Sequence, residues 1–475
     1  MLLLEIVLLL ILLACFRYLI KLISIAAAYK AKLLCSGVFI SNRSPESIIQ
    51  EDLSVEDLKY FKPITAQVDF ANQLATASLF GFGRRTAVYD SELGCTLVYE
   101  NQPSLTRPLP NPTLLGERVV QTVTDRLPKT IVAEPYFGLE TRLLPDRPRL
   151  LEEVKLTALD PVLDWAFTEP DPKHQRRTRA VVILLDGQIV AERYAAGFDQ
   201  DMPLPGWSMA KSVVNALVGI LVGQGKLNLD VPAPVPEWQG VGDLRREITL
   251  GQLMWMTSGL EFNEKSSNPV YDLTKMLLST PDAAAYAASK PLRAKPGSSW
   301  RYASGNTNIV CRIIREALGE EAYRQFPRQA LFEPLSMESA WFEMDASGTL
   351  VGSSFLYATA RDWAKFGQLY CQDGLWEGKR ILPEGWVNYS TVPCTPDRRY
   401  GAHFWLDIPQ KKNEPDTAKP LPADAFHAMG YEGQCVSIIP SRKLVVVRLG
   451  LTRKTSAWRQ DHFLNLILDC LSSLT

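Results

Sequence analysis

The sequence has few of the residues that build metal centres. Only four of its 475 residues are histidine, and none of the four belongs to an HExxH or HxH pair. The eight cysteines include no CxxC pair, which argues against a zinc ribbon and against thioredoxin-like chemistry. We therefore expect neither a metal site nor a cofactor.

Cysteine is also too sparse for a disulfide framework in a chain of this length, so most of the thiols are expected to be small buried groups. Cys35 and Cys95 lie outside the region that carries the motifs described below. These two could form a disulfide in an oxidising compartment. The sequence leaves that pairing open, because it does not supply the geometry.

An excess of charge of either sign is absent. Lys and Arg total 51 against 52 for Asp and Glu, so the formal net charge is -1 and nucleic-acid binding is not expected. Hydrophobic residues make up 46% and charged residues 22%, which is typical of a globular chain and argues against extensive disorder. The length, about three times a common domain length of ~150 residues, allows two or three domains.

Residues 1–29 are apolar apart from Glu5, Arg17 and Lys21. The segment exceeds the ~20 residues that a bilayer span needs, provided that the two cations reach the headgroups. A cleaved signal peptide begins with positive charge, whereas the first charge here is Glu5. Leu12–Cys15 resembles a lipoprotein cleavage box, but apolar sequence continues beyond it. We predict an uncleaved membrane anchor, with a buried or interfacial helix as the alternative.

Residues 30–150 are predicted to form a separate N-terminal appendage with β character. Residues 119–123 and 130–133 are β-branched runs, while 81–83 and the Pro-rich stretch 103–112 are typical of turns and linkers. This part of the sequence contains no catalytic constellation.

Residues 151–475 are predicted to form an α+β domain. Two β-rich runs, 180–185 and 188–194, flank Asp186-Gly187, which is a strong hairpin signal. A second hairpin is expected over 435–449 and an amphipathic helix over 458–471, with helices such as 362–370 in between. Strands at both ends and helices between them favour an antiparallel sheet flanked by helices, with a helical subdomain.

Ser208 and Lys211 form an SxxK motif that opens a helix without any charge from residue 212 to 222. A helix that is apolar on all sides is buried, so Lys211 is expected to be buried with it. The two side chains share one helix face, with ~5–6 Å between their Cβ atoms. Desolvation lowers the pKa of a buried lysine, so that its amine can accept the serine proton. An N-capping serine followed by an exposed lysine is the simpler alternative.

The stretch 300–306, Trp-Arg-Tyr-Ala-Ser-Gly-Asn, follows Lys295-Pro296-Gly297 and lies about 90 residues after the SxxK motif. With these elements the chain resembles the serine β-lactamase and penicillin-binding-protein superfamily, and within it the class C β-lactamase-like hydrolases, which include esterases and 6-aminohexanoate-dimer hydrolase. The resemblance implies that Ser208, Lys211 and Tyr302 are catalytic and that Ser304 binds substrate. Supporting stretches of the same resemblance are 253–260, 359–362 and 374–381.

The third motif of the superfamily, a strand that binds the substrate backbone and donates an oxyanion N–H, is predicted to begin near His427. Gly430 and Gly433 would then allow close approach of the backbone, and His427 would replace the usual lysine. Met256 stands where relatives often have histidine, and Ser304 stands where β-lactamases usually have asparagine. These departures argue against β-lactam specificity.

The sequence therefore predicts a serine hydrolase that acts through an acyl-enzyme on a small-molecule ester, amide or peptide-like substrate. Tyr271 and Trp405 are candidates for the wall of its pocket. β-Lactamase or D-alanyl-D-alanine peptidase activity is one alternative, and a catalytically silent protein that binds a cell-wall or peptide ligand is another. The oligomeric state is not predicted.

The predicted location is the inner membrane, with the catalytic domain in the periplasm or outside the cell, as the family resemblance implies. The distribution of basic residues predicts the opposite orientation. The first apolar run is followed by the basic residues Arg17, Lys21, Lys30 and Lys32, which by the positive-inside rule would place this flank in the cytoplasm. The orientation stays open.

Overall fold

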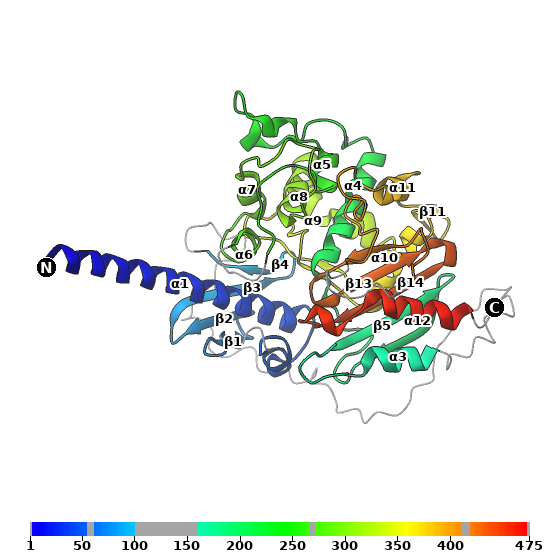
Figure 1. Cartoon of the computed structure of the whole chain (residues 1–475), viewed down its shortest axis with the longest axis horizontal. Helices are drawn as coiled ribbons and strands as arrows, with labels where there is room; N and C mark the ends of the chain where they lie inside the picture. Colours follow the sequence, from blue (N-terminus) through cyan, green and yellow to red (C-terminus); the bar gives the residue numbers. More distant parts are fainter. Residues whose placement is uncertain (1, 55–60, 100–158, 266–270, 410–418, 473–475) are drawn as a thin grey trace.

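The computed structural model describes residues 2–54, 61–99, 159–265, 271–409 and 419–472. One long helix, α1 (Leu2–Phe39), projects from a body built around a five-stranded antiparallel sheet (Figure 1). Helices cover both faces of this sheet, a mainly helical region lies beside it, and a small four-stranded sheet packs against α1. The predicted α+β class is confirmed.

The main sheet has the strand order β12-β13-β14-β5-β6, and every neighbouring pair is antiparallel. The first predicted hairpin is present, and its two turn residues, Asp186 and Gly187, have φ of 51° and 78°. Turns with two positive φ angles match the twist of the flanking strands, which explains the Asp-Gly signal. The second predicted hairpin joins β13 to β14. The strands are β5 (Thr178–Leu185), β6 (Gln188–Tyr194), β12 (Phe426–Met429), β13 (Cys435–Ile439) and β14 (Leu444–Gly450).

Alternate residues of the strands supply two separate cores, because successive side chains of a strand point to opposite faces. Val181 and Ile183 face the helices α3 (Asp160–Phe167) and α12 (Gln460–Ser472). Val182 and Leu184 join the core on the other face, where α10 (Ala360–Cys371) lies. The predicted C-terminal helix is confirmed, although it begins two residues later than expected. Of its predicted apolar face, Phe463 and Ile467 are fully buried, whereas Leu466 and Cys470 are partly exposed.

The helical region is centred on α4 (Ala210–Gly223), whose residues 210–221 are all buried. The buried amide of Asn215 accepts hydrogen bonds from the side chains of Tyr370, Trp386 and Ser390 and donates one to the carbonyl of Ala402. The other helices of this region are α5 (Leu250–Met254), α6 (Asp272–Leu278), α7 (Ala283–Ala288), α8 (Ser304–Leu318), α9 (Glu320–Pro327) and α11 (Trp386–Thr391). Short strands are β7 (Leu204–Pro205), β8 (Trp341–Phe342), β9 (Leu356–Ala358), β10 (Leu375–Trp376) and β11 (Lys379–Arg380).

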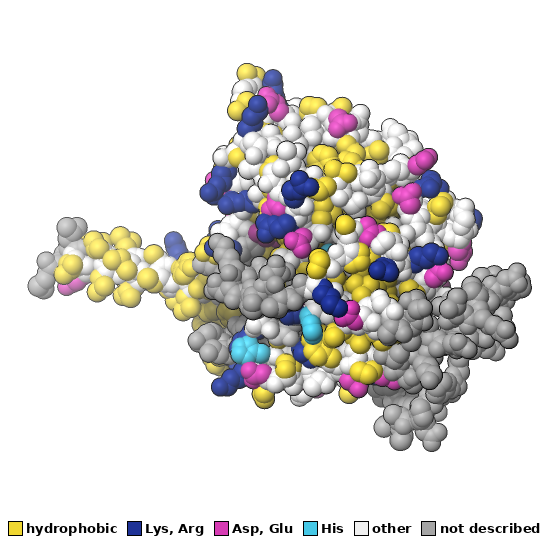
Figure 2. Space-filling view, turned by 45° about the vertical axis from the view of Figure 1, so that its right-hand side comes forward, with side chains coloured by type: hydrophobic (Ala, Val, Ile, Leu, Met, Phe, Trp, Pro, Cys, Tyr) yellow, Lys and Arg dark blue, Asp and Glu magenta, His cyan; other side chains and the backbone are white. Residues whose placement is uncertain are grey.

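The helix α1 has two halves with different surroundings. From Leu4 to Leu19 its side chains are exposed, and Figure 2 shows this half as a mostly apolar rod that projects from the body. The stretch Leu4–Phe39 contains a segment long and apolar enough to cross a membrane. From Ile23 onward the helix is largely buried, and it continues ten residues beyond the predicted segment. It packs on a sheet of order β1-β2-β3-β4, with strands β1 (Thr65–Asp69), β2 (Leu74–Leu79), β3 (Phe82–Asp90) and β4 (Gly94–Leu97).

Buried polar contacts join this N-terminal unit to the rest of the molecule. Lys32 of α1 forms an ion pair with Glu343, which also accepts a hydrogen bond of 2.8 Å from the Ser36 hydroxyl. Asp52 accepts two hydrogen bonds, of 2.8 and 2.9 Å, from the guanidinium of Arg179 on β5. Because an unpaired buried charge is costly, these contacts hold the N-terminal unit in one position on the rest of the molecule.

Other predictions for the N-terminal part have mixed outcomes. The turn expected around 81–83 is present as the β2–β3 connection, where Phe80 and Gly81 have φ of 49° and 86°. The thiols of Cys35 and Cys95 are free, buried and hydrogen-bonded to one another. The β-branched runs 119–123 and 130–133 and the linker 103–112 lie outside the described residues.

The division of α1 into a free and a packed half can be tested by a pair of identical truncations. Leu34 is fully buried against the small sheet, whereas Leu10 is 59% exposed. Leu34→Ala should lower the free energy of unfolding by ~2–5 kcal/mol, because it leaves a cavity in a packed core. Leu10→Ala should change it by less than ~0.5 kcal/mol. Chemical unfolding of the detergent-solubilised protein measures both, and equal effects would contradict a packed second half.

Candidate active site

Ser208 lies in a turn of 3₁₀ helix, Trp207–Met209, between strand β7 and helix α4. The residue before it, Trp207, has φ of 49°, a conformation that residues other than glycine rarely adopt. The Trp207 indole N–H donates a hydrogen bond of 3.0 Å to Glu432, which holds the ring in place. A Cβ on Gly206 would lie 2.3 Å from the ring of Trp363, so only glycine fits there. The local backbone therefore presents Ser208 at the start of a buried helix.

Lys211 lies one helical turn beyond Ser208, and its amine faces the serine hydroxyl. Lys211 Nζ is 3.0 Å from Ser208 Oγ and 2.8 Å from the carbonyl oxygen of Ser353. The side chain is only 1% exposed, and burial lowers its pKa to about 8. A substantial share of the amine is therefore neutral near physiological pH, and the neutral form can accept a proton from Ser208.

Tyr302 lies next to this pair, on the segment that leads into α8. Its ring centroid is 4.9 Å from Lys211 Nζ, and its ring stacks on that of Trp405 at 5.5 Å. Burial raises the pKa of the phenol, the nearby charge of Glu264 raises it further, and a hydrogen bond with Ser208 lowers it. Tyr302 is therefore a phenol at neutral pH and can give up a proton only while another group returns one.

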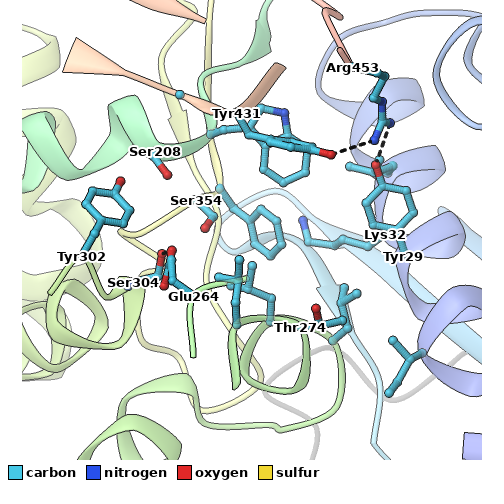
Figure 3. A pocket seen from close by; sticks show the side chains of 18 of the residues that line it. Tyr29, Lys32, Ser208, Glu264, Thr274, Tyr302, Ser304, Ser354, Tyr431 and Arg453 are labelled. Carbon is cyan, nitrogen blue, oxygen red and sulfur yellow. Dashed lines mark hydrogen bonds between the residues drawn. The ribbon is translucent and has the colours of Figure 1, made fainter. Parts of the chain in front are cut away.

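Glu264 completes the polar cluster, although nothing in the sequence predicted it. One of its carboxylate oxygens accepts a hydrogen bond of 2.8 Å from the backbone N–H of Ser304, and the other accepts one of 2.5 Å from the Ser304 hydroxyl (Figure 3). Burial raises the pKa of Glu264, while Lys211 lowers it, and the carboxylate in turn raises the pKa of Lys211. Glu264 stands alone in a loop, so no spacing or periodicity in the sequence singles it out.

The edge strand β12 comes close to Ser208 at its end. A Cβ on Gly430 would lie 2.2 Å from the carbonyl oxygen of Gly206, so the strand and the Ser208 turn can approach this closely only with glycine at 430. On the other side of β12, Trp405 exchanges two backbone hydrogen bonds with His427, of 2.9 and 2.7 Å. This pairing fixes the Trp405 ring against Tyr302.

The structure does not bring the remaining predicted residues into the pocket. The His427 ring is buried between the sheet and α12, with Nδ1 2.9 Å from the Ser437 hydroxyl, and burial lowers its pKa to about 4. A neutral histidine in that position cannot stand in for a substrate-binding lysine. Gly433 has φ of 80° and serves a turn beside Arg448, and Tyr271 precedes α6 outside the cavity wall.

Ser208, Tyr302, Ser304, Gly430 and Trp405 line one cavity of about 810 Å³. Figure 3 shows that this cavity extends from Ser208 to Tyr29 and Lys32 on the packed half of α1. Two helices supply most of its far wall, α1 through Ile25, Ala26, Tyr29, Lys30, Lys32 and Leu33, and α6 through Leu273, Thr274, Leu277 and Leu278. The contribution of α1 was not predicted.

The profile of the family described as Beta-lactamase matches residues 159–464, more than half of the chain. The chain belongs to the beta-lactamase family. Its predicted membership of the serine β-lactamase and penicillin-binding-protein superfamily is thereby confirmed, and the motifs and the sheet described above lie within the matched region. Helix α1 and the small sheet precede it.

Relatives of this beta-lactamase-family chain include enzymes with hydrolase names. The 6-aminohexanoate-dimer hydrolase of Paenarthrobacter ureafaciens is 25% identical over 363 residues, which cover 70% of this chain and 83% of that protein. Among solved structures, a family VIII carboxylesterase is similar with a TM-score of 0.52 and 16% identity, covering 66% of this chain and 97% of that one. A putative beta-lactamase from Bacteroides dorei DSM 17855 gives a TM-score of 0.53 at 16% identity, with the same coverage. At these identities the two structures support the fold alone.

The electrostatic coupling between Glu264 and Lys211 in this beta-lactamase-family site predicts a pH shift. Because only the neutral amine accepts a proton, the rate at which a fluorophosphonate labels Ser208 should rise as the pH passes the Lys211 pKa of about 8. Glu264→Gln removes a charge that raises this pKa, so the rise should move to lower pH by about 1 unit. The exposed Glu261 is the matched control, and an identical midpoint in Glu264→Gln and Glu261→Gln would contradict the coupling.

Proposed function

We propose that the protein is a serine hydrolase that cleaves ester or amide bonds through an acyl-enzyme. The observation that carries the proposal is the 3.0 Å contact between Lys211 Nζ and Ser208 Oγ in a buried setting beside Tyr302. Desolvation activates the amine as a base, and the short contact positions it for transfer of the serine proton. Membership of a family with hydrolase relatives supports the same reaction class.

In the proposed mechanism, neutral Lys211 takes the hydroxyl proton of Ser208 while Ser208 Oγ attacks the carbonyl carbon. The backbone N–H of Ser208 and an N–H at the end of β12 near Gly430 hold the oxyanion. The Tyr302 phenol then gives its proton to the leaving alcohol or amine, and Lys211 returns the serine proton to Tyr302. Water, deprotonated by the same pair, releases the acid and restores Ser208.

We propose that esters or linear amides are preferred over β-lactams, because the basic residues of the cavity wall already have partners. The carboxylate of a β-lactam needs a cation that is free to bind it. Of the described basic residues on the wall, Lys30 donates to the carbonyl of Ile64, Lys32 pairs with Glu343, and Arg453 pairs with Glu432 at 3.0 Å. A site without a partner for a charged group discriminates strongly against a substrate that carries one.

We also propose that α1 is an uncleaved membrane anchor. Its exposed stretch, 16 residues from Leu4 to Leu19, is ~24 Å long at 1.5 Å per residue and so covers most of the ~30 Å of a hydrocarbon core. A cleaved signal sequence would not normally continue into a protein core, whereas the second half of α1 packs on a sheet and lines the cavity. The location of the catalytic domain outside the inner membrane stays a prediction.

Active-site labelling tests the nucleophile. A fluorophosphonate probe should label the wild-type protein, and Ser208→Ala should lose both the label and ester turnover. Lys211→Met should lose at least ~10²-fold in kcat/KM, because it removes the general base. Ser354→Ala is the matched control, since Ser354 lies in the same cavity and should leave labelling intact. Unchanged labelling of Ser208→Ala would refute the mechanism, and absence of label and turnover in the wild type would favour a silent binding protein.

The preferred bond can be tested with two chromogenic substrates. The wild-type protein should hydrolyse p-nitrophenyl butyrate with a higher kcat/KM than nitrocefin, because the ester has no carboxylate that must be paired. His427→Lys should leave this order unchanged, since the ring at 427 points into the sheet packing and not into the cavity. Faster turnover of nitrocefin would show that the substrate preference is assigned wrongly.

A further inference from the structure

We propose that the physiological substrate is a membrane amphiphile with a long acyl chain, and that this chain lies in the cavity between Ser208 and the packed half of α1. The inference rests on the proposed serine-hydrolase function. It adds the substrate class, and it gives the anchor helix a direct part in binding the substrate.

The first support is the chemistry of the cavity wall beyond Ser208. Ile25, Leu33, Leu273, Leu277 and Phe355 present apolar side chains to the cavity from three different segments. A hydrocarbon chain gains about 0.8 kcal/mol for each CH₂ that it buries against such a wall, which corresponds to about fourfold in binding per methylene. A short acyl group would leave most of this wall uncovered.

The three basic side chains on the same wall, Lys30, Lys32 and Arg453, already have partners, so they do not call for a charged substrate. Arg453 donates hydrogen bonds to the hydroxyls of Tyr29 and Tyr431, of 3.1 and 3.3 Å (Figure 3). It also forms its ion pair with Glu432. These contacts join α1 to the segment that follows β12. They fix the far wall of the cavity to the strand whose end approaches Ser208.

The second support is the continuity of the cavity with the free half of α1. Ile25 on the cavity wall lies six residues after the exposed Leu19, which is ~9 Å along the helix. Phe80 and Phe82, 86% and 57% exposed, lie at the β2–β3 turn. A Cβ on the adjacent Gly83 would be 2.8 Å from Ile23, so this turn lies where α1 leaves the body.

Exposed phenylalanine side chains beside a spanning helix can enter the boundary between the lipid headgroups and the acyl chains, where their apolar surface leaves water. With the free half of α1 in a bilayer and Phe80 and Phe82 at its surface, the cavity begins at that surface. A lipid chain then has only a short distance to move from the membrane to Ser208.

The acyl part of the substrate, and not the leaving group, is assigned to the cavity. The acyl group stays bonded to Ser208 until water arrives, whereas the leaving alcohol or amine must depart before that step. A deep apolar cavity retains the group that has to stay through both steps, and this group is the acyl chain.

The chain-length dependence of ester hydrolysis tests the proposal on the full-length protein in detergent micelles. The probes are p-nitrophenyl acetate, butyrate, octanoate and laurate. From butyrate to octanoate kcat/KM should rise at least ~10²-fold, at about fourfold per added methylene. A kcat/KM that is equal for these two esters, or higher for butyrate, would overturn the proposal.

Two substitutions that narrow the cavity from different helices sharpen the test. Thr274→Trp on α6 and Leu33→Trp on α1 should each lower kcat/KM for octanoate and laurate at least ~10-fold and leave acetate within about twofold. Lys275→Trp, on α6 but away from the cavity wall, is the matched control and should change neither. Equal losses for acetate and laurate in folded Thr274→Trp and Leu33→Trp would overturn the proposal.

Failure of the proposed function gives a different pattern from failure of this inference. If a fluorophosphonate does not label Ser208 and no ester is hydrolysed, the hydrolase assignment is wrong, and the lipid assignment that rests on it is wrong as well. If Ser208 is labelled and acetate is hydrolysed without any chain-length preference, the hydrolase stands and only the lipid substrate is wrong. Where a tryptophan variant does not fold, the wild-type series decides alone.

Discussion

The site depends on the burial of one amine. Lys211 lies on the first turn of α4, and every residue of that helix from 210 to 221 is buried. A charged ammonium in such a place loses its hydration, which is why burial brings its pKa down to about 8. Three features position groups around this amine: the turn before Ser208, the approach of β12 at Gly430 and the stacking of Tyr302 on Trp405. Glu264 limits how far the pKa falls, because its carboxylate favours the protonated form.

The second organising feature is that one helix belongs to two environments. A helix that was apolar and exposed over its whole length would make no contacts with the rest of the protein. In α1 the second half carries small side chains, such as Ala27, Ala28 and Ala31, which let the backbone come close to the small sheet. The same half carries Lys32, whose buried pair with Glu343 fixes the helix to the catalytic body. The second half of α1, the small sheet and the beta-lactamase-family domain therefore form one packed unit.

Much of this could be predicted from the sequence, and the successes share a cause. The Asp186-Gly187 hairpin, the buried α4 and the SxxK pair are local patterns, in which a few neighbouring residues determine the outcome. Glu264 and the α1 wall of the cavity were missed because they arise from contacts between distant segments. His427 was predicted to bind substrate because of its position in a motif. Such a match gives the position of a residue on a strand, but it does not show what surrounds the side chain. Its ring packs on Ser437 instead. The functions of Ser208, Lys211 and Tyr302 stay predictions that the geometry supports.

The division of α1 near Ile23 has a consequence for proteolytic release. A protease that cut the helix before Ile20 would remove, of the described side chains, only exposed ones, because Ile20 is the first residue of α1 that packs against the core of the small sheet and the residues that line the cavity all follow it. The released protein would be soluble and would keep a complete cavity. A cut after Tyr29 would instead remove Ile25 and Ala26 from the wall and open it to water. The position of a single cleavage would thus determine whether the released protein keeps an intact cavity or loses part of the cavity wall.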